Sequence, residues 1–285
     1  MTPGPREIPY RLRWDAGGHR PGAHRSRQGD AGLAFRGHRR LVDGGDPRRL
    51  DIHASLRDPL GQWWVRTLAE RRAVTVVLLA DLSASMDDDT PPPRVQALAA
   101  LADSLAWSAQ RLGDAFGCLG ADRALHRLGP WPPTRQRGCG PVLAQALQAH
   151  RRQGAQAAGI DGLLAAVAEL PRQRCLVFLA SDFHWPAATL GAVMDALAPH
   201  DVVPVVLWQR RDFELPARDG LAWLQDAEGH GAHLVWVRPA LRLRHADRLA
   251  QARQALTERL RAWQRQPVFQ IDGFDPDAFA VHFQA

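Results

Sequence analysis

Lysine and asparagine are both absent from this chain of 285 residues, so its 36 basic side chains are all arginine. Without lysine there is no phosphate-binding loop of the G-x-x-x-x-G-K type, no Schiff-base lysine and no kinase-type lysine. Binding of ATP through a lysine-dependent motif is therefore excluded.

Long apolar runs are missing too. The longest mostly apolar run, Ala73 to Ala80, has eight residues, whereas a membrane-spanning helix needs about 20. No apolar segment follows Met1, so we expect no secretory signal and no membrane insertion.

Cysteine is scarce, and Cys118, Cys139 and Cys175 form no C-x-x-C pair. This usage fits a reducing compartment and argues against a structural zinc, so we expect a cytoplasmic protein.

Positive charge is concentrated in the first quarter of the chain. Residues 1–72 hold 15 arginines and 8 acidic residues, a formal charge of +7, whereas the remainder is close to neutral. Such a segment could contact nucleic acid or an acidic protein. Alternatively its arginines bind nearby carboxylates, as the alternating signs of Arg40, Asp46, Arg48 and Asp51 favour. We expect residues 1–72 to dock on the main domain, with nucleic-acid binding as the alternative.

From residue 73 onward, apolar strands alternate with helical patterns. Three continuous apolar runs predict buried strands at 73–80, 174–181 and 201–208. Two short strands are expected at 115–120 and 124–128, a hairpin at 222–237, and helices at 94–111, 141–150, 160–170, 187–199 and 240–264. Buried strands separated by helices predict a doubly wound, mostly parallel α/β sheet. We assign this domain to residues 73–238 and a helical tail to residues 239–285.

The first and second buried strands both end on carboxylates. Asp81 is followed at alternate positions by Ser83 and Ser85, and the second strand ends in Ser181 and Asp182. Carboxylate and hydroxyl oxygens suit Mg²⁺ or Mn²⁺, and ligands of open α/β sheets bind at the carboxyl ends of strands. The alternative is that both aspartates only cap turns or helices. Together the two strand ends predict a metal site formed by Asp81, Ser83, Ser85 and Asp182.

These strand ends resemble the metal-ion-dependent adhesion site of von Willebrand factor A-type domains. The flanking sequence resembles the domain-of-unknown-function 58 family. The resemblance rests on residues along most of the chain: Gly22 to Ser26, Phe35, Arg39 to Asp51, Val65-Arg66, Glu70-Arg71, Arg211 to Pro216 and Asp226 to Gly229. His53 stands near the family's usual tryptophan, and Leu41 where tyrosine is usual.

One position departs from the family pattern. The family usually reads Gly-Thr-Asp where this chain reads Gly159-Ile160-Asp161, and the threonine is the residue that completes the metal shell in von Willebrand A domains. Either Asp161 or water replaces the threonine, or the site has lost its metal. The acidic run Asp87 to Asp89, which follows Ser85 closely in the chain, could attract a cation or form a solvated loop.

The resemblance implies a binding protein, not an enzyme. In such sites a partner's carboxylate completes the metal shell, and no nucleophile–base pair is evident from the spacing here. The family is typically encoded beside MoxR-type AAA+ ATPases, which implies an adaptor that helps mature or assemble other complexes, a dehydrogenase among them. The alternatives are the nucleic-acid-binding protein and a metal-dependent hydrolase using Asp81 and Asp182.

Overall fold

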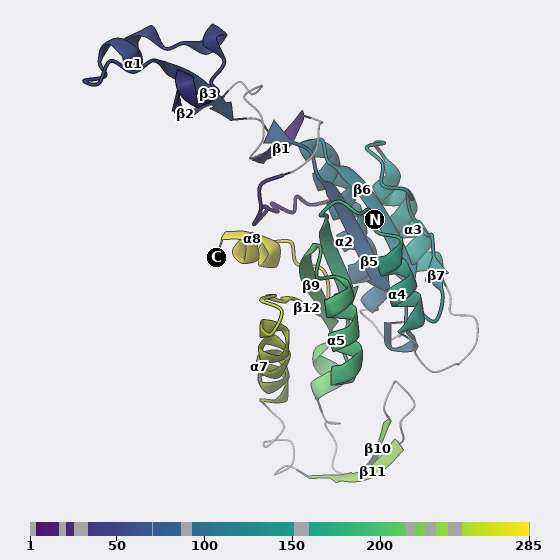
Figure 1. The fold of residues 1–285 in the computed structure, drawn as a ribbon. Coiled ribbons are helices and arrows are strands. Elements are labelled where there is room, and N and C mark those ends of the chain that lie inside the picture. The colour runs from purple at the N-terminus through teal and green to yellow at the C-terminus, as the bar shows by residue number, and fades with distance from the viewer. Residues whose placement is uncertain are drawn as a thin grey trace. The chain divides into compact units, whose positions relative to one another are not determined.

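The computed structural model describes residues 4–16, 21–25, 34–69, 71–86, 93–150, 160–214, 220–225, 232–238 and 247–284 (Figure 1). These residues form two compact units. Unit 1 contains the described residues of 4–11, 75–111 and 115–284, and unit 2 contains those of 12–74 and 112–114. The predicted strands at 174–181 and 201–208 therefore both belong to unit 1, as does most of the strand predicted at 73–80.

A six-stranded sheet forms the centre of unit 1, in the order β12-β9-β8-β5-β6-β7. Neighbouring strands pair in parallel except β6 and β7, which are antiparallel. The strands are β5 (Thr75–Asp81), β6 (Ala115–Ala121), β7 (Leu125–His126), β8 (Leu176–Ser181), β9 (Asp201–Trp208) and β12 (Val268–Ile271). Because β6 joins one side of β5 and β8 the other, the winding reverses at β5. The predicted doubly wound α/β fold is confirmed.

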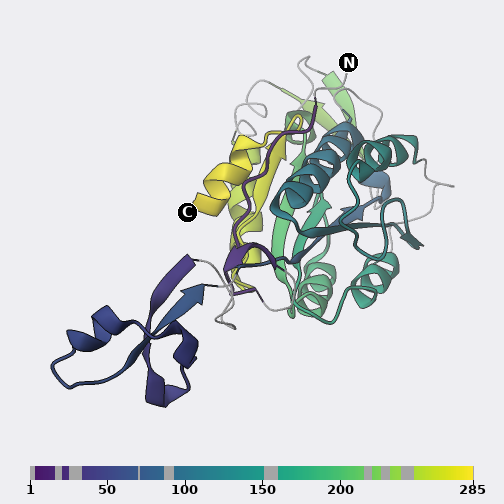
Figure 2. The same ribbon diagram turned by 90° about the horizontal axis from the view of Figure 1, so that it is seen from above.

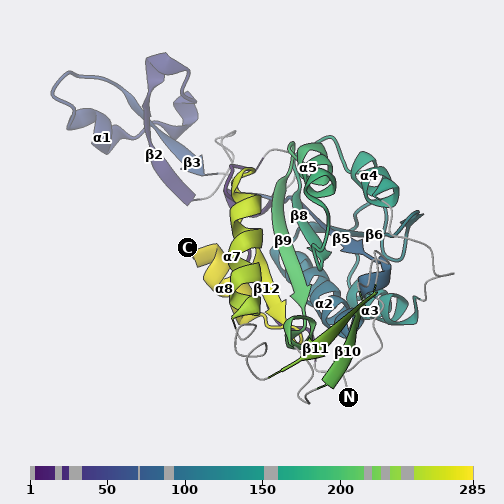
Figure 3. The same ribbon diagram turned by 90° about the horizontal axis from the view of Figure 1, so that it is seen from below.

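Helices cover both faces of this sheet, as Figures 2 and 3 show for α2 and α3 on one side and α4 and α5 on the other. The helices of unit 1 are α2 (Arg94–Leu112), α3 (Cys139–Ala149), α4 (Asp161–Ala168), α5 (Ala187–Ala196), α7 (Arg248–Arg261) and α8 (Asp277–Gln284). Val177 of β8 belongs to a buried apolar cluster with side chains of α4, α5 and α7. The next residue, Phe178, faces the other way, and its ring centroid lies 6.1 Å from that of Phe279 in α8. Burial on both faces explains why β6, β8 and β9 are buried along their whole length.

The expectation of a purely helical tail over residues 239–285 is corrected by β12. This strand lies between α7 and α8 in the chain and pairs in parallel with β9 at the edge of the sheet. Four residues are too few to show a recognisable alternation of apolar and polar side chains, so the local pattern did not reveal the strand. The C-terminal region thus completes the sheet.

The remaining predicted elements of unit 1 are present. Strands β10 (Gly220–Gln225) and β11 (Ala232–Val237) form the predicted antiparallel hairpin. The helix predicted at 240–264 corresponds to α7, and residues 240–246 lie outside the described chain. Two 3-10 helices, η3 (Ala84–Met86) and η4 (Arg210–Phe213), follow β5 and β9.

Unit 2 consists of two antiparallel strand pairs and short helices. Strand β1 (Pro21–Arg25) pairs with β4 (Arg71–Arg72), and β2 (Ala34–Arg40) pairs with β3 (Trp64–Ala69). The helices are η1 (Leu41–Asp43), η2 (Pro47–Arg49) and α1 (Ile52–Leu56). Arginines of this unit bind nearby carboxylates, as in the pair Arg40–Asp43 at 2.8 Å. Docking of the basic segment on the sheet domain stays a prediction.

None of the helices in the described part of the chain combines the length and the apolar character needed to cross a bilayer. The longest of them, α2, has 19 residues and contains Arg94, Asp103 and Arg111. Its buried residues recur at helical spacing, as expected of a helix that packs one face on a sheet.

Candidate metal centre at the strand ends

Asp81 is the last residue of β5, and Asp182 directly follows the last residue of β8. The two strands pair in parallel with Ala80 opposite Ala180, so their carboxyl ends meet at one edge of the sheet. Both aspartates are almost fully buried, with exposures of 2% and 1%. The prediction that they sit at the ends of adjacent strands is confirmed.

The loop after β5 brings two serine hydroxyls together. The backbone N–H of Ser83 donates to Asp81 Oδ1 at 2.9 Å, which turns the loop back over the strand end. The Oγ atoms of Ser83 and Ser85 lie 3.2 Å apart, and both side chains are buried. Oxygens on adjacent corners of a magnesium octahedron lie about 2.9 Å apart, because each Mg–O distance is about 2.0–2.1 Å. The hydroxyl pair is therefore close to the spacing that a shared cation requires.

Ser181 is a residue of this centre to which the sequence analysis gave no role. Its hydroxyl donates to Asp81 Oδ2 at 2.6 Å and accepts the backbone N–H of Phe183 at 3.0 Å. Phe183 has a φ of 55°, a left-handed conformation that is uncommon for a bulky residue. This tight turn holds Asp182 beside the end of β5. The sequence signal for Ser181 is that a polar residue ends the otherwise apolar run of β8.

The two buried carboxylates differ in their electrostatic surroundings. Burial and the neighbouring charge of Asp182 raise the pKa of Asp81 to about 6, against the opposing effect of hydrogen bonds from Ser181 and Ser83. Burial would also raise the pKa of Asp182, but the hydrogen bonding and charge of His184, together with Ser85, lower it. His184 thus lowers the pKa of Asp182, whereas the charge of Asp182 raises the pKa of Asp81.

One oxygen of Asp182 is left without a hydrogen bond. Its Oδ2 is buried and accepts none from the described residues. His184 Nδ1 lies 3.2 Å from this oxygen, within ion-pair distance but without hydrogen-bond alignment. Burial would lower the pKa of His184, yet the facing Asp182 carboxylate raises it. A buried carboxylate oxygen without a donor is costly unless a cation occupies the position it faces.

Aromatic packing holds this histidine in place. The His184 ring stacks on Trp208 at the end of β9, with the two planes 6° apart and the centroids 5.9 Å apart. Trp208 Nε1–H in turn donates to the backbone carbonyl of Asp182 at 2.6 Å. The third buried strand therefore supports the loop that carries Asp182.

A buried arginine braces the serine loop from the other side. Arg94, the first residue of α2, donates to the carbonyls of Ser85 at 2.8 Å and Leu207 at 3.2 Å, and it pairs with Asp212 in η4. Arg94 belongs to no motif that is recognisable in the sequence. The sequence signal for Arg94 is a positive charge in the first turn of a helix, where the helix dipole disfavours it. Such a charge requires a partner from elsewhere in the fold.

No interaction among the described residues joins the remaining predicted site residues to these four donors. Ile160 precedes α4 and packs, partly buried, against the apolar cluster of unit 1, so it provides no ligand oxygen. Asp161 is exposed at the start of α4, and no interaction within the described ranges joins it to the four donors. Gly159 and the run Asp87 to Asp89 lie outside the described residues.

Asp81, Ser83, Ser85 and Asp182 fit a hard divalent cation. The unbonded Asp182 Oδ2 and the spacing of the two hydroxyls are the observations that support this fit. The donors are all oxygen, as Mg²⁺ and Mn²⁺ prefer, and four protein ligands leave positions of an octahedral shell open for water or a partner.

The cysteines supply no reactive thiol near this centre. Cys118 and Cys175 are fully buried, and burial raises the pKa of both thiols to about 12. A thiol with such a pKa stays protonated and is a poor nucleophile or ligand at neutral pH. Cys175 belongs to the buried apolar cluster of unit 1.

A family model described as "Protein of unknown function DUF58" matches residues 38–255. The chain belongs to the DUF58 family. The matched residues of this DUF58 protein include Asp81, Ser83, Ser85 and Asp182, as well as Ile160. A search of curated proteins finds no relative that matches the chain.

Several solved structures are similar to this DUF58 protein at low identity. The conserved hypothetical protein BatB from Bacteroides thetaiotaomicron is 13% identical, with 74% of this chain and 96% of BatB covered and a TM-score of 0.41. An aerotolerance-related membrane protein from Bacteroides fragilis is 15% identical, with coverages of 67% and 100% and a TM-score of 0.38.

Proximal thread matrix protein 1 from the mussel byssus, in a structure with a zinc-occupied MIDAS motif, is 17% identical with a TM-score of 0.34. The match covers 47% of the DUF58 chain and 38% of the mussel protein, so the chain spans under two fifths of that relative.

Proposed function

We propose that this DUF58 protein is a non-enzymatic, cytoplasmic adaptor that recognises protein partners through a divalent cation, Mg²⁺ or Mn²⁺. Asp81, Ser83, Ser85 and Asp182 hold the ion. A carboxylate of the partner completes its coordination shell. The observation that carries this proposal is the buried Asp182 Oδ2, which accepts no hydrogen bond from the described residues, lies 3.2 Å from His184 Nδ1 and is near a second buried carboxylate.

The chain's own residues prepare the centre for binding. Ser181 and the Ser83 N–H hold the Asp81 carboxylate in one orientation, so the loop needs little rearrangement when the ion enters. Arg94 ties the serine loop to the end of β9. The cation supplies the attraction for a partner's carboxylate, and the preorganised loop lowers the entropic cost of the contact.

We further propose that the adaptor works with a MoxR-type AAA+ ATPase in the maturation or assembly of other protein complexes. Since the chain contains no lysine, it lacks the lysine-dependent loop with which such an ATPase binds nucleotide. The nucleotide-driven step in this proposal therefore belongs to the ATPase, and the adaptor connects it to a client complex such as a dehydrogenase.

Capture of the ATPase by the immobilised full chain tests this function. The partner is the MoxR-type ATPase of the same genome, offered in Mg²⁺ and, separately, in EDTA. We expect capture in Mg²⁺ only, and at least a tenfold loss in Asp182→Asn. The matched control is Asp161→Asn, which makes the same chemical change on an exposed aspartate outside the donor set.

Calorimetry with Mg²⁺ on the same proteins separates the two halves of the proposal. Mg²⁺ binding without capture of the ATPase would contradict the partner and leave the metal centre standing. Equal capture in EDTA and by Asp182→Asn would contradict recognition through the ion.

A further inference from the structure

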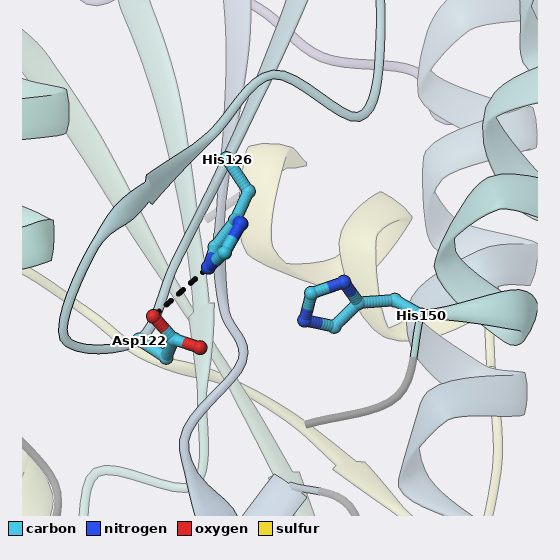
Figure 4. A group of neighbouring side chains, drawn as sticks. All are labelled: Asp122, His126 and His150. Carbon is cyan, nitrogen blue, oxygen red and sulfur yellow. Dashed lines mark hydrogen bonds and ion pairs between the residues drawn. The ribbon is translucent and has the colours of Figure 1, made fainter. Parts of the chain in front are cut away.

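A second cluster of metal-ligand side chains lies one strand away from the oxygen donors. Asp122, His126 and His150 each offer one ligand atom, and the three atoms lie within 4.8 Å of one another. Figure 4 shows the two imidazoles and the carboxylate converging on a common space. Asp122 directly follows Ala121, the residue of β6 that pairs with Asp81 of β5. The cluster is therefore at the same carboxyl edge of the sheet as the proposed magnesium centre.

The turn between β6 and β7 orients the carboxylate. Asp122 Oδ1 accepts the backbone N–H of Ala124 at 2.8 Å and lies 2.9 Å from His126 Nε2. Its second oxygen is on the side that faces His150 (Figure 4). Burial would raise the pKa of Asp122, but the Ala124 N–H and the neighbouring His126 and His150 lower it. The carboxylate is thus charged at neutral pH, as a metal ligand must be.

Close packing of α4 holds this turn. A Cβ atom added to Gly162, in the first turn of α4, would lie 2.5 Å from the carbonyl oxygen of Asp122 and 2.7 Å from that of Ala124. Only glycine allows this approach without movement of the backbone. The turn that carries Asp122 and His126 is therefore backed by a helix.

His150 joins the cluster from the C-terminal end of α3. Its backbone N–H donates to the carbonyl of Ala146 at 2.9 Å, which extends the last helical turn. Its ring centroid lies 4.9 Å from that of His126, with the planes 62° apart. Asp81 and His150 also line one small cavity of about 20 Å³, with room for one water molecule. One ligand residue of each group thus borders the same small cavity.

We propose that Asp122, His126 and His150 bind a zinc ion. Two imidazoles with one carboxylate form a donor set that suits Zn²⁺, whereas Mg²⁺ disfavours the imidazole nitrogens, and three protein ligands leave a fourth tetrahedral position open. Ligands of tetrahedral Zn²⁺ lie about 3.4 Å apart, since each bond is about 2.0–2.1 Å. The present separations, from 2.9 Å to at most 4.8 Å, bracket that value. All three side chains are partly exposed, so the ion can enter from solvent.

Zinc titration of tag-free, metal-stripped full-length protein tests the site, with a fluorescent chelator as competitor. We expect one zinc ion per chain in the presence of millimolar Mg²⁺. Asp122→Asn, His126→Gln and His150→Ala should each weaken binding at least tenfold. Matched controls are Asp277→Asn and His53→Ala, which change exposed residues of the same types and should bind as the wild type does. Circular dichroism melting of each metal-free variant verifies that it is folded.

Cobalt provides a readout of geometry. Co²⁺ in place of zinc should show the intense visible absorption of a tetrahedral site, absent in His126→Gln and present in Asp182→Asn. Zinc binding abolished by Asp182→Asn but unchanged in the three cluster variants would overturn the proposal, because the ion would then occupy the oxygen donors. Failure of the wild type to bind zinc at 0.1 mM would also overturn it. Neither result bears on capture of the ATPase.

Discussion

The two compact units are stabilised by different interactions. In unit 1 the strands β6, β8 and β9 are buried along their whole length, and helices bury both sheet faces. In unit 2 large apolar side chains such as Val42, Leu56 and Leu60 are more than 75% exposed. Its polar interactions centre on Asp51, which accepts from the Ala54 N–H and lies 2.8 Å from Arg66 and 3.0 Å from His38. Unit 1 is held by apolar burial, and unit 2 depends more on charge.

This difference predicts opposite responses to pH. Unit 1 contains a buried carboxylate, Asp81, whose pKa is raised to about 6, mainly by burial. Unit 2 contains Asp51, whose pKa is held well below its usual range by hydrogen bonds from Arg66 and then His38. Acidification from neutral pH should therefore first raise the free energy of unfolding of unit 1, as Asp81 becomes protonated. Further acidification should then lower that of unit 2, as Asp51 becomes protonated. Hydrogen exchange resolved by peptide can follow each unit separately.

The largest expected effect is that of Phe178→Ala. The side chain is fully buried between the sheet and Phe279, and truncating a buried phenylalanine costs about 3–5 kcal/mol. Exchange should accelerate strongly in peptides covering β5 and β8 and little in those covering β2 and β3. Equal acceleration in both regions would show that the units unfold together, and would contradict the claim that they are stabilised separately.

The next largest effect concerns Asp81→Asn. The folded pKa lies above the unfolded value, so in EDTA the stability of unit 1 should decrease as pH rises from about 4 to about 6 and then level off. A shift of about two pKa units corresponds to a free energy of unfolding on the order of 3 kcal/mol. Asp81→Asn should remove this dependence and stabilise the metal-free protein at pH 7.5. Chemical denaturation across pH measures it, and an unchanged pH profile would contradict the assignment.

Asp51→Ala should have a smaller effect, confined to unit 2. The substitution removes the N-cap of α1 and the partner of Arg66, so exchange in residues 34–69 should accelerate about tenfold at pH 7. Because the folded pKa lies below the unfolded one, the native contribution is present above about pH 4 and is lost on further acidification. Asp58→Ala, which removes another aspartate of unit 2, is the control. A variant that matches wild type at both pH 7 and pH 3 would refute this role.

Ile160→Thr should have the smallest effect, a change in the Mg²⁺ affinity of unit 1. The threonine restores a hydroxyl at the position where the family usually has one, and we expect Mg²⁺ affinity to rise about tenfold, or about 1.4 kcal/mol. Calorimetry should show the gain, and Mg²⁺ should slow exchange in unit 1 but not in unit 2. Ile160→Val is the control without an oxygen. No gain in Ile160→Thr would mean that residue 160 lies beyond reach of the ion.

Much of the fold follows from local patterns, and the misses have a physical cause. The apolar runs of β5, β8 and β9 identify buried parallel strands, and the rule for strand ends then brings Asp81 to Asp182. The tail strand β12 was missed because its pairing with β9 joins segments about 60 residues apart. Ser181 was passed over because its role depends on which residue its hydroxyl faces. Neither property is encoded in local periodicity.

Residue patterns along the chain were enough to give the class of fold, the family and the absence of a lysine-dependent nucleotide site, and to predict four oxygen donors for a metal. Only the folded structure shows that Arg94 binds the serine loop and that Asp182 Oδ2 is buried without a hydrogen bond from the described residues. It also places His150, at the C-terminal end of α3, beside Asp122 and His126 of the turn between β6 and β7. The spacing of apolar residues along the chain reports the periodicity of single helices and strands. Contacts between these elements arise only when burial of their apolar faces packs them together.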